Sequence, residues 1–284
     1  MNHNTQISHT IIDTLYRLGI NDICISPGAR NSPIIQACSN SKIKMHSILD
    51  ERSAGFYALG ISKKNKKPVA LSCTSGTALG NLFPAIIEAR MAEVPLIIIT
   101  SDRPEGHINK GENQTIYQNN IYDKYTVDFE NINPLIDDLD SITNKINKIY
   151  NASTGIKQNQ QISEKGPAHI NIHFDEPLLD SDSNLNLSEI NIKIINPLAD
   201  DIDPFKIDRR IKRPIIICGQ SDLKKQKEDI FEIADKIGAP ILSDISSNVT
   251  SNNNVISFYE HFIDTIEAPD LILRFGKKPL SKKL

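Results

Sequence analysis

Residues 68–100 read PVALSCTSGTALGNLFPAIIEARMAEVPLIIIT. The stretch begins with a short apolar run at 68–73 and closes with a more apolar run at 95–100. Between them, apolar residues recur at three- and four-residue steps over 77–91, which is typical of a helix with one buried face. Two strands joined through a helix form a crossover unit, which predicts a parallel sheet covered by helices.

The same alternation extends along most of the chain and predicts the fold class. In the first part, the sequence predicts strands at 22–26, 44–49, 68–73, 95–100 and 168–174. Helices are predicted at 7–18, 32–39, 51–62, 77–91 and 134–150. A shorter second pattern predicts a helix at 222–237 and strands at 214–219, 240–244 and 271–276. The predicted class is α/β, with a three-layer parallel-sheet domain at 1–180, a linker at 181–202 and part of a second, Rossmann-like domain at 203–284.

The composition is that of an ordinary globular protein. Hydrophobic residues make up 39% and charged residues 24%, and the formal net charge is −3. Such a charge gives no electrostatic basis for binding nucleic acid. No apolar run approaches the roughly 20 residues of a membrane span, and the opening MNHNTQISHT is too polar for a signal peptide. We therefore expect a cytoplasmic protein without nucleic-acid or membrane partners.

The four cysteines, Cys24, Cys38, Cys73 and Cys218, include no CxxC pair. Three of them lie in or at the end of apolar, strand-like runs, where a thiol packs as a small hydrophobe. We expect buried, unreactive thiols. The alternative is a metal or redox site.

Ligands of open parallel sheets bind beyond the carboxyl ends of the strands. The first such end is SPGARNSP at 26–33, where Pro27 and Gly28 predict a turn and Arg30 precedes a helix. The planar fork of an arginine can bind both oxygens of a carboxylate. A surface arginine beside an ordinary turn is the alternative interpretation.

The second strand end is DERSAG at 50–55, where a strand is followed directly by charged residues. Asp50 suits the N-cap of the next helix, and Glu51 suits its first turn, where the helix dipole favours an acid. Taken by themselves, these residues favour a structural role.

The third strand end is a tight polar turn that opens a helix, formed by Thr74, Ser75, Gly76 and Thr77. Its backbone N–H groups can hold an anion or the polar edge of a ring. The turn matches neither GxGxxG nor the phosphate-binding lysine motif, so it is a weak signal alone.

The fourth strand end is the long polar loop TSDRPEGHINKGENQTI at 100–116. A loop of this length at a strand's carboxyl end is often functional. Arg103, Asn113 and Gln114 are candidate binding residues. His107 could act as a base, with a solvated loop histidine as the alternative.

Taken together, these loops resemble thiamine-diphosphate-dependent enzymes. The segments that carry the resemblance are SPGARNSP, DERSAGFYALG, TSGTALGNLFPAIIEA and PLIIITSDRPEG followed by GENQTI, in this order and spacing. Within that family, the chain is similar to the synthases of menaquinone biosynthesis that join 2-oxoglutarate to isochorismate. The clear match covers about residues 6–175, and a looser one continues to RFGKKPLSKKL.

The resemblance implies a role for each matched loop. Glu51 would be catalytic, because the family's glutamate hydrogen-bonds N1′ of the cofactor's aminopyrimidine and so activates the cofactor. The residues implied to lie at the cofactor are Pro27, Gly28, Glu51, Thr74, Ser75, Gly76 and Thr77. Those implied to bind substrate are Arg30, Arg103, Asn113 and Gln114. Many relatives have a serine where this chain has Ala29, which puts any hydrogen bond of that hydroxyl in doubt.

The resemblance also implies what lies outside this chain. The family binds the diphosphate and a divalent metal, Mg²⁺ or Mn²⁺, in a third domain, through a loop of glycine and acidic residues. This sequence has no Gly-Asp dipeptide, so no metal ligand is predicted in it. We expect this chain to be the amino-terminal half of a longer enzyme, as an expressed fragment, the product of a truncated gene or a split subunit. We expect this half to be inactive alone. We also expect a homo-oligomer, a dimer or tetramer, of the full-length enzyme.

Two other functions stay open. One is a different thiamine-diphosphate carboligase or decarboxylase, such as an acetolactate-synthase-like enzyme, against which the DRP and GENQT segments argue. The other is a non-catalytic α/β module that retains an old site. Testing 2-oxoglutarate against pyruvate as the donor discriminates the first.

Overall fold

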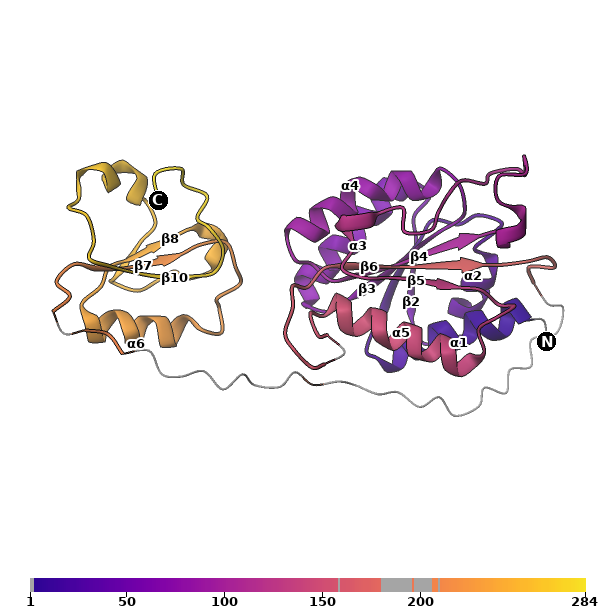
Figure 1. Cartoon of the computed structure of the whole chain (residues 1–284), viewed down its shortest axis with the longest axis horizontal. Coiled ribbons are helices and arrows are strands. Elements are labelled where there is room, and N and C mark those ends of the chain that lie inside the picture. The colour runs from indigo at the N-terminus through magenta and orange to yellow at the C-terminus, as the bar shows by residue number, and fades with distance from the viewer. Residues whose placement is uncertain (1–2, 158, 180–195, 197–205, 209) are drawn as a thin grey trace. The chain divides into compact units, whose positions relative to one another are not determined.

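The computed structural model of the chain describes residues 3–157, 159–179, 196, 206–208 and 210–284. These residues form two compact units, one within residues 1–200 and the other within 201–284 (Figure 1). Both units are parallel sheets with helices, which confirms the predicted α/β class. The predicted linker at 181–202 lies outside the described residues except for residue 196, so the predicted domain boundaries stay predictions.

The first unit is built on six parallel strands in the order β2-β1-β3-β4-β6-β5. The strands are β1 (Asp22–Ile25), β2 (Lys44–Ser47), β3 (Val69–Cys73), β4 (Leu96–Asp102), β5 (Phe129–Ile132) and β6 (Pro167–His173). Every residue of β3, β4 and β6 is buried, as expected for central strands covered on both faces. Only β5 was not predicted, because its sequence, FENI, has just two apolar residues.

Helices cover both faces of this sheet. On one face, α1 (His3–Arg17), α2 (Ser32–Ser39) and α5 (Leu139–Ser153) share a core. On the other face, α3 (Glu51–Asn65) and α4 (Ala78–Met91) enclose a second core. Figure 1 shows α4 above the strands and α1 and α5 below them. The first unit therefore has the three layers that the alternating pattern predicts.

Helix α5 begins five residues later than predicted, at Leu139 instead of residue 134. A turn precedes it, in which Asn133 accepts a hydrogen bond from the backbone N–H of Leu135 (3.0 Å). Asp138 then caps the helix by accepting from the N–H of Ser141 (2.8 Å). Leu135, which extends the apolar periodicity of the helix, is 83% exposed on this turn. The apolar spacing extends to residues before the first turn of the helix, whereas the N-cap Asp138 determines where the helix begins.

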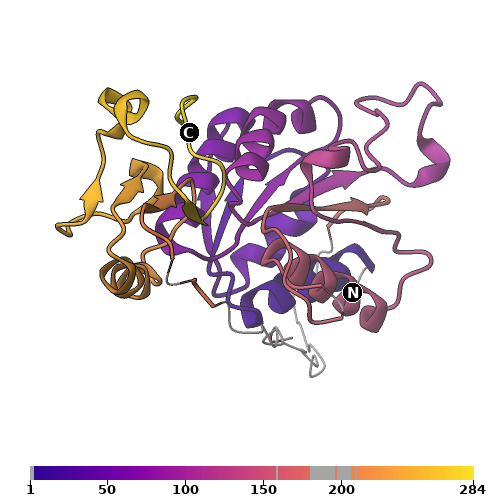
Figure 2. The same cartoon turned by 60° about the vertical axis from the view of Figure 1, so that its left-hand side comes forward.

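The second unit has four parallel strands in the order β10-β7-β8-β9. They are β7 (Pro214–Cys218), β8 (Ile241–Ser243), the unpredicted β9 (Val255–Ile256) and β10 (Leu271–Phe275), with one helix, α6 (Lys227–Ile237). Figure 2 views α6 nearly end-on against these strands. Helix α6 starts later than the predicted 222, because residues 224–226 form a turn.

All four cysteines are free and buried, as predicted. Burial raises the pKa of Cys24 and Cys38 to about 12 and that of Cys218 to about 11. A thiol that stays protonated at neutral pH is a poor nucleophile and a poor metal ligand. Separately, none of the helices in the described ranges combines the length and apolar character that a membrane crossing requires.

Candidate active site

The predicted site residues lie on four loops at one edge of the six-stranded sheet. All the strands run parallel, so the loops after β1, β2, β3 and β4 leave from the same edge, which we call the carboxyl edge. The sheet thereby brings together segments that are far apart in the sequence.

The loop after β1 is shaped by Asn31, a residue that the sequence did not single out. Asn31 is fully buried, accepts a hydrogen bond from the N–H of Gly28 (2.8 Å) and donates to the carbonyl of Ser26 (3.0 Å). A Cβ on Gly28 would stand 2.6 Å from the Cβ of Thr74, so only a glycine lets this loop lie against the turn after β3. The structure thus joins two of the residues predicted at the cofactor, while Pro27 beside them is exposed.

The carboxylates after β2 have separate tasks. Asp50 is the N-cap of α3 and accepts from the N–H of Ser53 (2.7 Å), a bond that lowers the pKa of its carboxyl. Glu51 follows in the first turn, is half-buried, and accepts at Oε2 from the side-chain amide of Asn81 on α4 (3.0 Å). Burial raises the pKa of Cys73 at the end of β3, and the charge of Glu51 raises it further. Glu51 therefore lies against α4 and the end of β3, beside the polar turn.

The turn after β3 is fixed by contacts with two residues of the loop after β4, Gln114 and Gln118. Gly76 has a positive φ of 79°, which favours glycine. Its N–H donates to Oε1 of the fully buried Gln118 (2.9 Å). A Cβ on Gly76 would stand 2.6 Å from Cγ of Gln114, so the turn also packs directly on the loop after β4. Ser75 is buried in this turn, whereas Thr77 is exposed.

Two arginines converge on the same edge. Nη1 of Arg103 donates to Oγ of Ser75 (2.9 Å) and to the carbonyl of Gln114 (3.0 Å). Nη1 of Arg30 donates to the carbonyl of Phe174 (3.0 Å). Each of the two side chains is only 11% exposed. Burial lowers the pKa of Arg30, and the charge of Arg103 lowers it further. Carboxylates of this chain offset part of that repulsion, since Glu176 lies 3.4 Å from Arg30 and Glu112 lies 3.8 Å from Arg103. A partly buried pair of guanidinium groups can also bind the carboxylate of a ligand.

One predicted residue stands apart from this arrangement. Asn113 is exposed, and within the described ranges no hydrogen bond joins it to the other predicted residues. Gln114, its neighbour, donates from Nε2 to the carbonyl of Ser75 (2.9 Å). Three residues that sequence reasoning missed as site residues are the amides Asn31, Asn81 and Gln118. Asn81 does occur in the TSGTALGN segment, which is the signal that could have found it.

The groups at the carboxyl edge fit the pyrimidine end of thiamine diphosphate. A half-buried carboxylate, Glu51, can share a proton with a ring nitrogen, and the neighbouring glycine turn offers backbone groups to a polar ring edge. The described part of the chain has no group of three His, Cys, Asp or Glu residues that could hold a metal ion.

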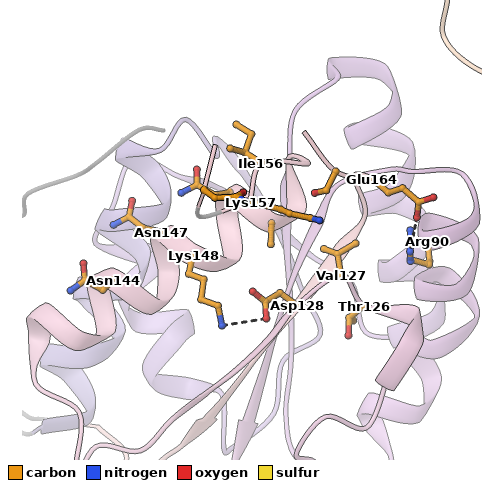
Figure 3. A pocket seen from close by; sticks show the side chains of 14 residues that line it. Arg90, Thr126, Val127, Asp128, Asn144, Asn147, Lys148, Ile156, Lys157 and Glu164 are labelled. Atoms are coloured by element: carbon orange, nitrogen blue, oxygen red, sulfur yellow. Dashed lines mark hydrogen bonds and ion pairs between the residues drawn. The ribbon is translucent and has the colours of Figure 1, made fainter. Parts of the chain in front are cut away.

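A cavity of about 1120 Å³ lies at the other edge of the same sheet (Figure 3). It is lined by α5 and by the segments that precede β5 and β6, so it is at the amino ends of the strands. Its lining holds two ion pairs, with Lys148 3.4 Å from Asp128 and Arg90 2.8 Å from Glu164. None of the predicted site residues lines it.

Comparison with known proteins finds a family that matches part of the chain. Residues 5–123 match the family described as thiamine pyrophosphate enzyme, N-terminal TPP binding domain. These residues are a thiamine pyrophosphate enzyme domain. The matched range contains all four loops of the candidate site. The resemblance seen in the sequence is thereby confirmed.

The comparison with curated proteins extends beyond that domain. A 2-succinyl-5-enolpyruvyl-6-hydroxy-3-cyclohexene-1-carboxylate synthase of Psychromonas ingrahamii is 34% identical over 100% of this chain and 51% of its own length. Synthases with the same name from Desulfitobacterium hafniense and Listeria innocua are each 31% identical over 96% of the chain. The chain spans about half the length of these relatives: it covers 51% of the Desulfitobacterium hafniense protein and 50% of the Listeria innocua protein.

Proposed function

We propose that this chain supplies the pyrimidine-binding half of the active site of a 2-succinyl-5-enolpyruvyl-6-hydroxy-3-cyclohexene-1-carboxylate synthase of menaquinone biosynthesis. The complete enzyme would join 2-oxoglutarate, with loss of carbon dioxide, to isochorismate. The names of the relatives support this function. The structural observation that carries it is the convergence of Glu51, the glycine turn and two arginines at one sheet edge.

Glu51 is the residue that we propose as catalytic. When bound, thiamine diphosphate supplies the nucleophilic carbon that attacks the 2-oxo acid. Glu51 would hold or release a proton at its carboxylate when the pyrimidine ring of the cofactor is bound beside it. Asn81 donates to one carboxylate oxygen and so fixes the direction of the group, and the first turn of α3 favours its negative charge.

The arginines suit the proposed substrates. Both 2-oxoglutarate and isochorismate carry two carboxylates, and an arginine fork can bind both oxygens of one carboxylate. We propose that Arg30 and Arg103 bind substrate carboxylates and that Gln114, whose side chain lies against Ser75, lines the same place. Asn113 belongs to the proposal on the family resemblance alone.

Three further parts of the proposal rest on the resemblance without a structural observation. They are a homo-oligomeric enzyme (dimer or tetramer), a divalent metal (Mg²⁺ or Mn²⁺) whose ligands lie outside this chain, and a cytoplasmic location.

The decisive experiment is purification of the protein from its own cells through a tag at residue 1, so that any polypeptide that completes the site is retained. The purified protein is given thiamine diphosphate, Mg²⁺ and isochorismate, with either 2-oxoglutarate or pyruvate as the donor. We expect carbon dioxide release and isochorismate consumption with 2-oxoglutarate only. Turnover with pyruvate alone would favour an acetolactate-synthase-like enzyme, and no turnover with either donor would favour a non-catalytic module.

A further inference from the structure

Gln118 lies in the loop between β4 and β5, and its side chain is fully buried. Its Oε1 accepts from the N–H of Gly76 (2.9 Å), and its Nε2 donates to the carbonyl of Ser101 (3.2 Å) and to Oδ1 of Asn171 (3.0 Å). A backbone N–H can only donate and a carbonyl can only accept, so these partners fix which end of the amide points each way.

The hydrogen bond from Gly76 to Gln118 affects the predicted substrate-binding residues through Ser75. Gly76 is covalently joined to Ser75, and Ser75 is the point where two predicted substrate-binding side chains meet. Oγ of Ser75 accepts from Nη1 of Arg103 (2.9 Å), and its carbonyl accepts from Nε2 of Gln114 (2.9 Å). Movement of the Gly76 N–H would therefore displace the partner that aims Arg103.

The Asn171 end reaches the same arginine from the other side. Nδ2 of Asn171 donates to Oδ2 of the fully buried Asp102 (3.1 Å). Oδ1 of Asp102 accepts from the backbone N–H of Arg103 (2.8 Å). Gln118 is thus joined to the glycine turn by one hydrogen bond and to the backbone of Arg103 by a chain of three.

We propose that Gln118 is a positioning residue, which holds the Ser75–Gly76 turn so that Arg103 and Gln114 are aimed at a substrate carboxylate. The inference rests on the proposed function, because that function assigns the carboxylate to this place. These hydrogen bonds are buried in a region of low dielectric. Moving one of the groups would leave a buried polar partner unpaired, which costs free energy, so the network resists displacement of the turn.

The test uses Gln118→Leu, which keeps the size but removes all three hydrogen bonds, in the protein purified as above. We expect faster hydrogen exchange at the Gly76 amide, and about a tenfold or larger increase in KM for 2-oxoglutarate or isochorismate with kcat changed less, because a lost uniform binding interaction appears in KM. Gln118→Asn keeps the amide but is one methylene short of Gly76, so it carries the same test if the leucine variant does not fold.

The matched control is Ser153→Ala, at the opposite edge of the same sheet. Oγ of Ser153 is buried and donates to the carbonyl of Gly166 (2.8 Å), so its loss also removes a buried side-chain-to-backbone bond. We expect this control to lower the melting temperature without a change in either KM. A general loss of stability would move both variants alike.

Two results would overturn the inference alone: an unchanged Gly76 exchange rate in the Gln118 variants, or faster exchange with both KM values within roughly threefold of the wild type. A wild-type protein that neither binds 2-oxoglutarate in calorimetry nor consumes it would overturn the proposed function, and this inference with it. The two failures are therefore distinguishable.

Discussion

The carboxyl edges of the two sheets differ in what covers them. At the carboxyl edge of the first sheet, four loops present a carboxylate, a glycine turn and two arginines. At the carboxyl edge of the second sheet, the chain covers its own strand ends. Both sheets are parallel, so the strand arrangement alone does not decide which edge becomes a site.

The second edge is closed by backbone contacts. A Cβ on Gly219, just after β7, would stand 1.9 Å from the carbonyl oxygen of Lys277, just after β10. Asp244, after β8, accepts hydrogen bonds from the hydroxyl of Tyr259 and from the N–H of Leu280 (2.7 Å). The polar group at this strand end is thus bound by the chain itself. At the first edge, Arg30 and Arg103 repel each other, and each also lies near a carboxylate of the chain, Glu176 at 3.4 Å and Glu112 at 3.8 Å.

The largest expected effect is that of Glu51→Gln on turnover. Glutamine keeps the shape of the side chain and can still accept from Asn81, but it cannot exchange a proton with a ring nitrogen. We expect kcat to fall by about 10²–10⁴, the usual contribution of a positioned acid or base. Glu88→Gln, on the exposed side of α4, is the control and should turn over as the wild type does. A Glu51→Gln protein with wild-type kcat would refute the assignment of the open edge as the reaction centre.

Gly219→Ala tests the closed edge. The added methyl group must displace the carbonyl of Lys277 and with it the segment that binds Asp244, so we expect the second unit to lose about 3 kcal/mol of stability. Hydrogen exchange of the β7 and β10 amides measures this unit separately. Lys278→Ala changes an exposed side chain beside the same carbonyl and should shift stability by less than about 0.5 kcal/mol. Equal exchange rates in the two variants would show that the edge is not closed as described.

A smaller effect is expected where α3, which carries Glu51, approaches α4. A Cβ on Gly55 would stand 2.7 Å from the Cβ of Ala85, whereas nothing lies within 4 Å of a Cβ on Gly60 in the same helix. Alanine favours a helix over glycine by about 1 kcal/mol at either position. We therefore expect Gly60→Ala to raise the free energy of unfolding in urea slightly, and Gly55→Ala to lower it by about 1–2 kcal/mol. Similar values for the two would mean that the helices are not in close contact.

The sequence predicted which loops follow the strands at the open edge, because those strands are strongly patterned. Runs such as 95–100 are apolar and β-branched, and the turns after them are read from local residues. The amides that organise the site were not predictable in that way. Asn81 binds Glu51 from 30 positions away, and Gln118 binds Gly76 from 42 positions away. Such contacts depend on the strand order, which local patterns do not contain, and β5 was missed because FENI lacks a clear pattern.

The last predicted effect is a pH dependence and concerns His169, which lies fully buried on β6, paired with Ile98 of β4 and Phe129 of β5. Its Nε2 is 2.8 Å from the hydroxyl of Thr100, and burial lowers its pKa from 6.5 to about 3. The unfolded chain therefore binds a proton that the folded chain does not bind between these values, so stability falls as the pH falls from 6.5 towards 3. The slope contributed by this one residue is at most about 1.4 kcal/mol per pH unit.

The pH dependence of urea unfolding in the wild type and in His169→Leu isolates this contribution. Burial also raises the pKa of Asp102, and that shift has the opposite sign, because the folded state then holds a proton that the unfolded state releases as the pH rises. Asp102 is present in both proteins, so its effect cancels in the difference. We expect the leucine variant to lose the His169 slope, and His261→Leu, at an exposed position, to retain it. If His169→Leu and the wild type had parallel pH profiles, the histidine would not be held neutral in the folded chain, and the interior of the sheet around it would be wetter than its burial implies.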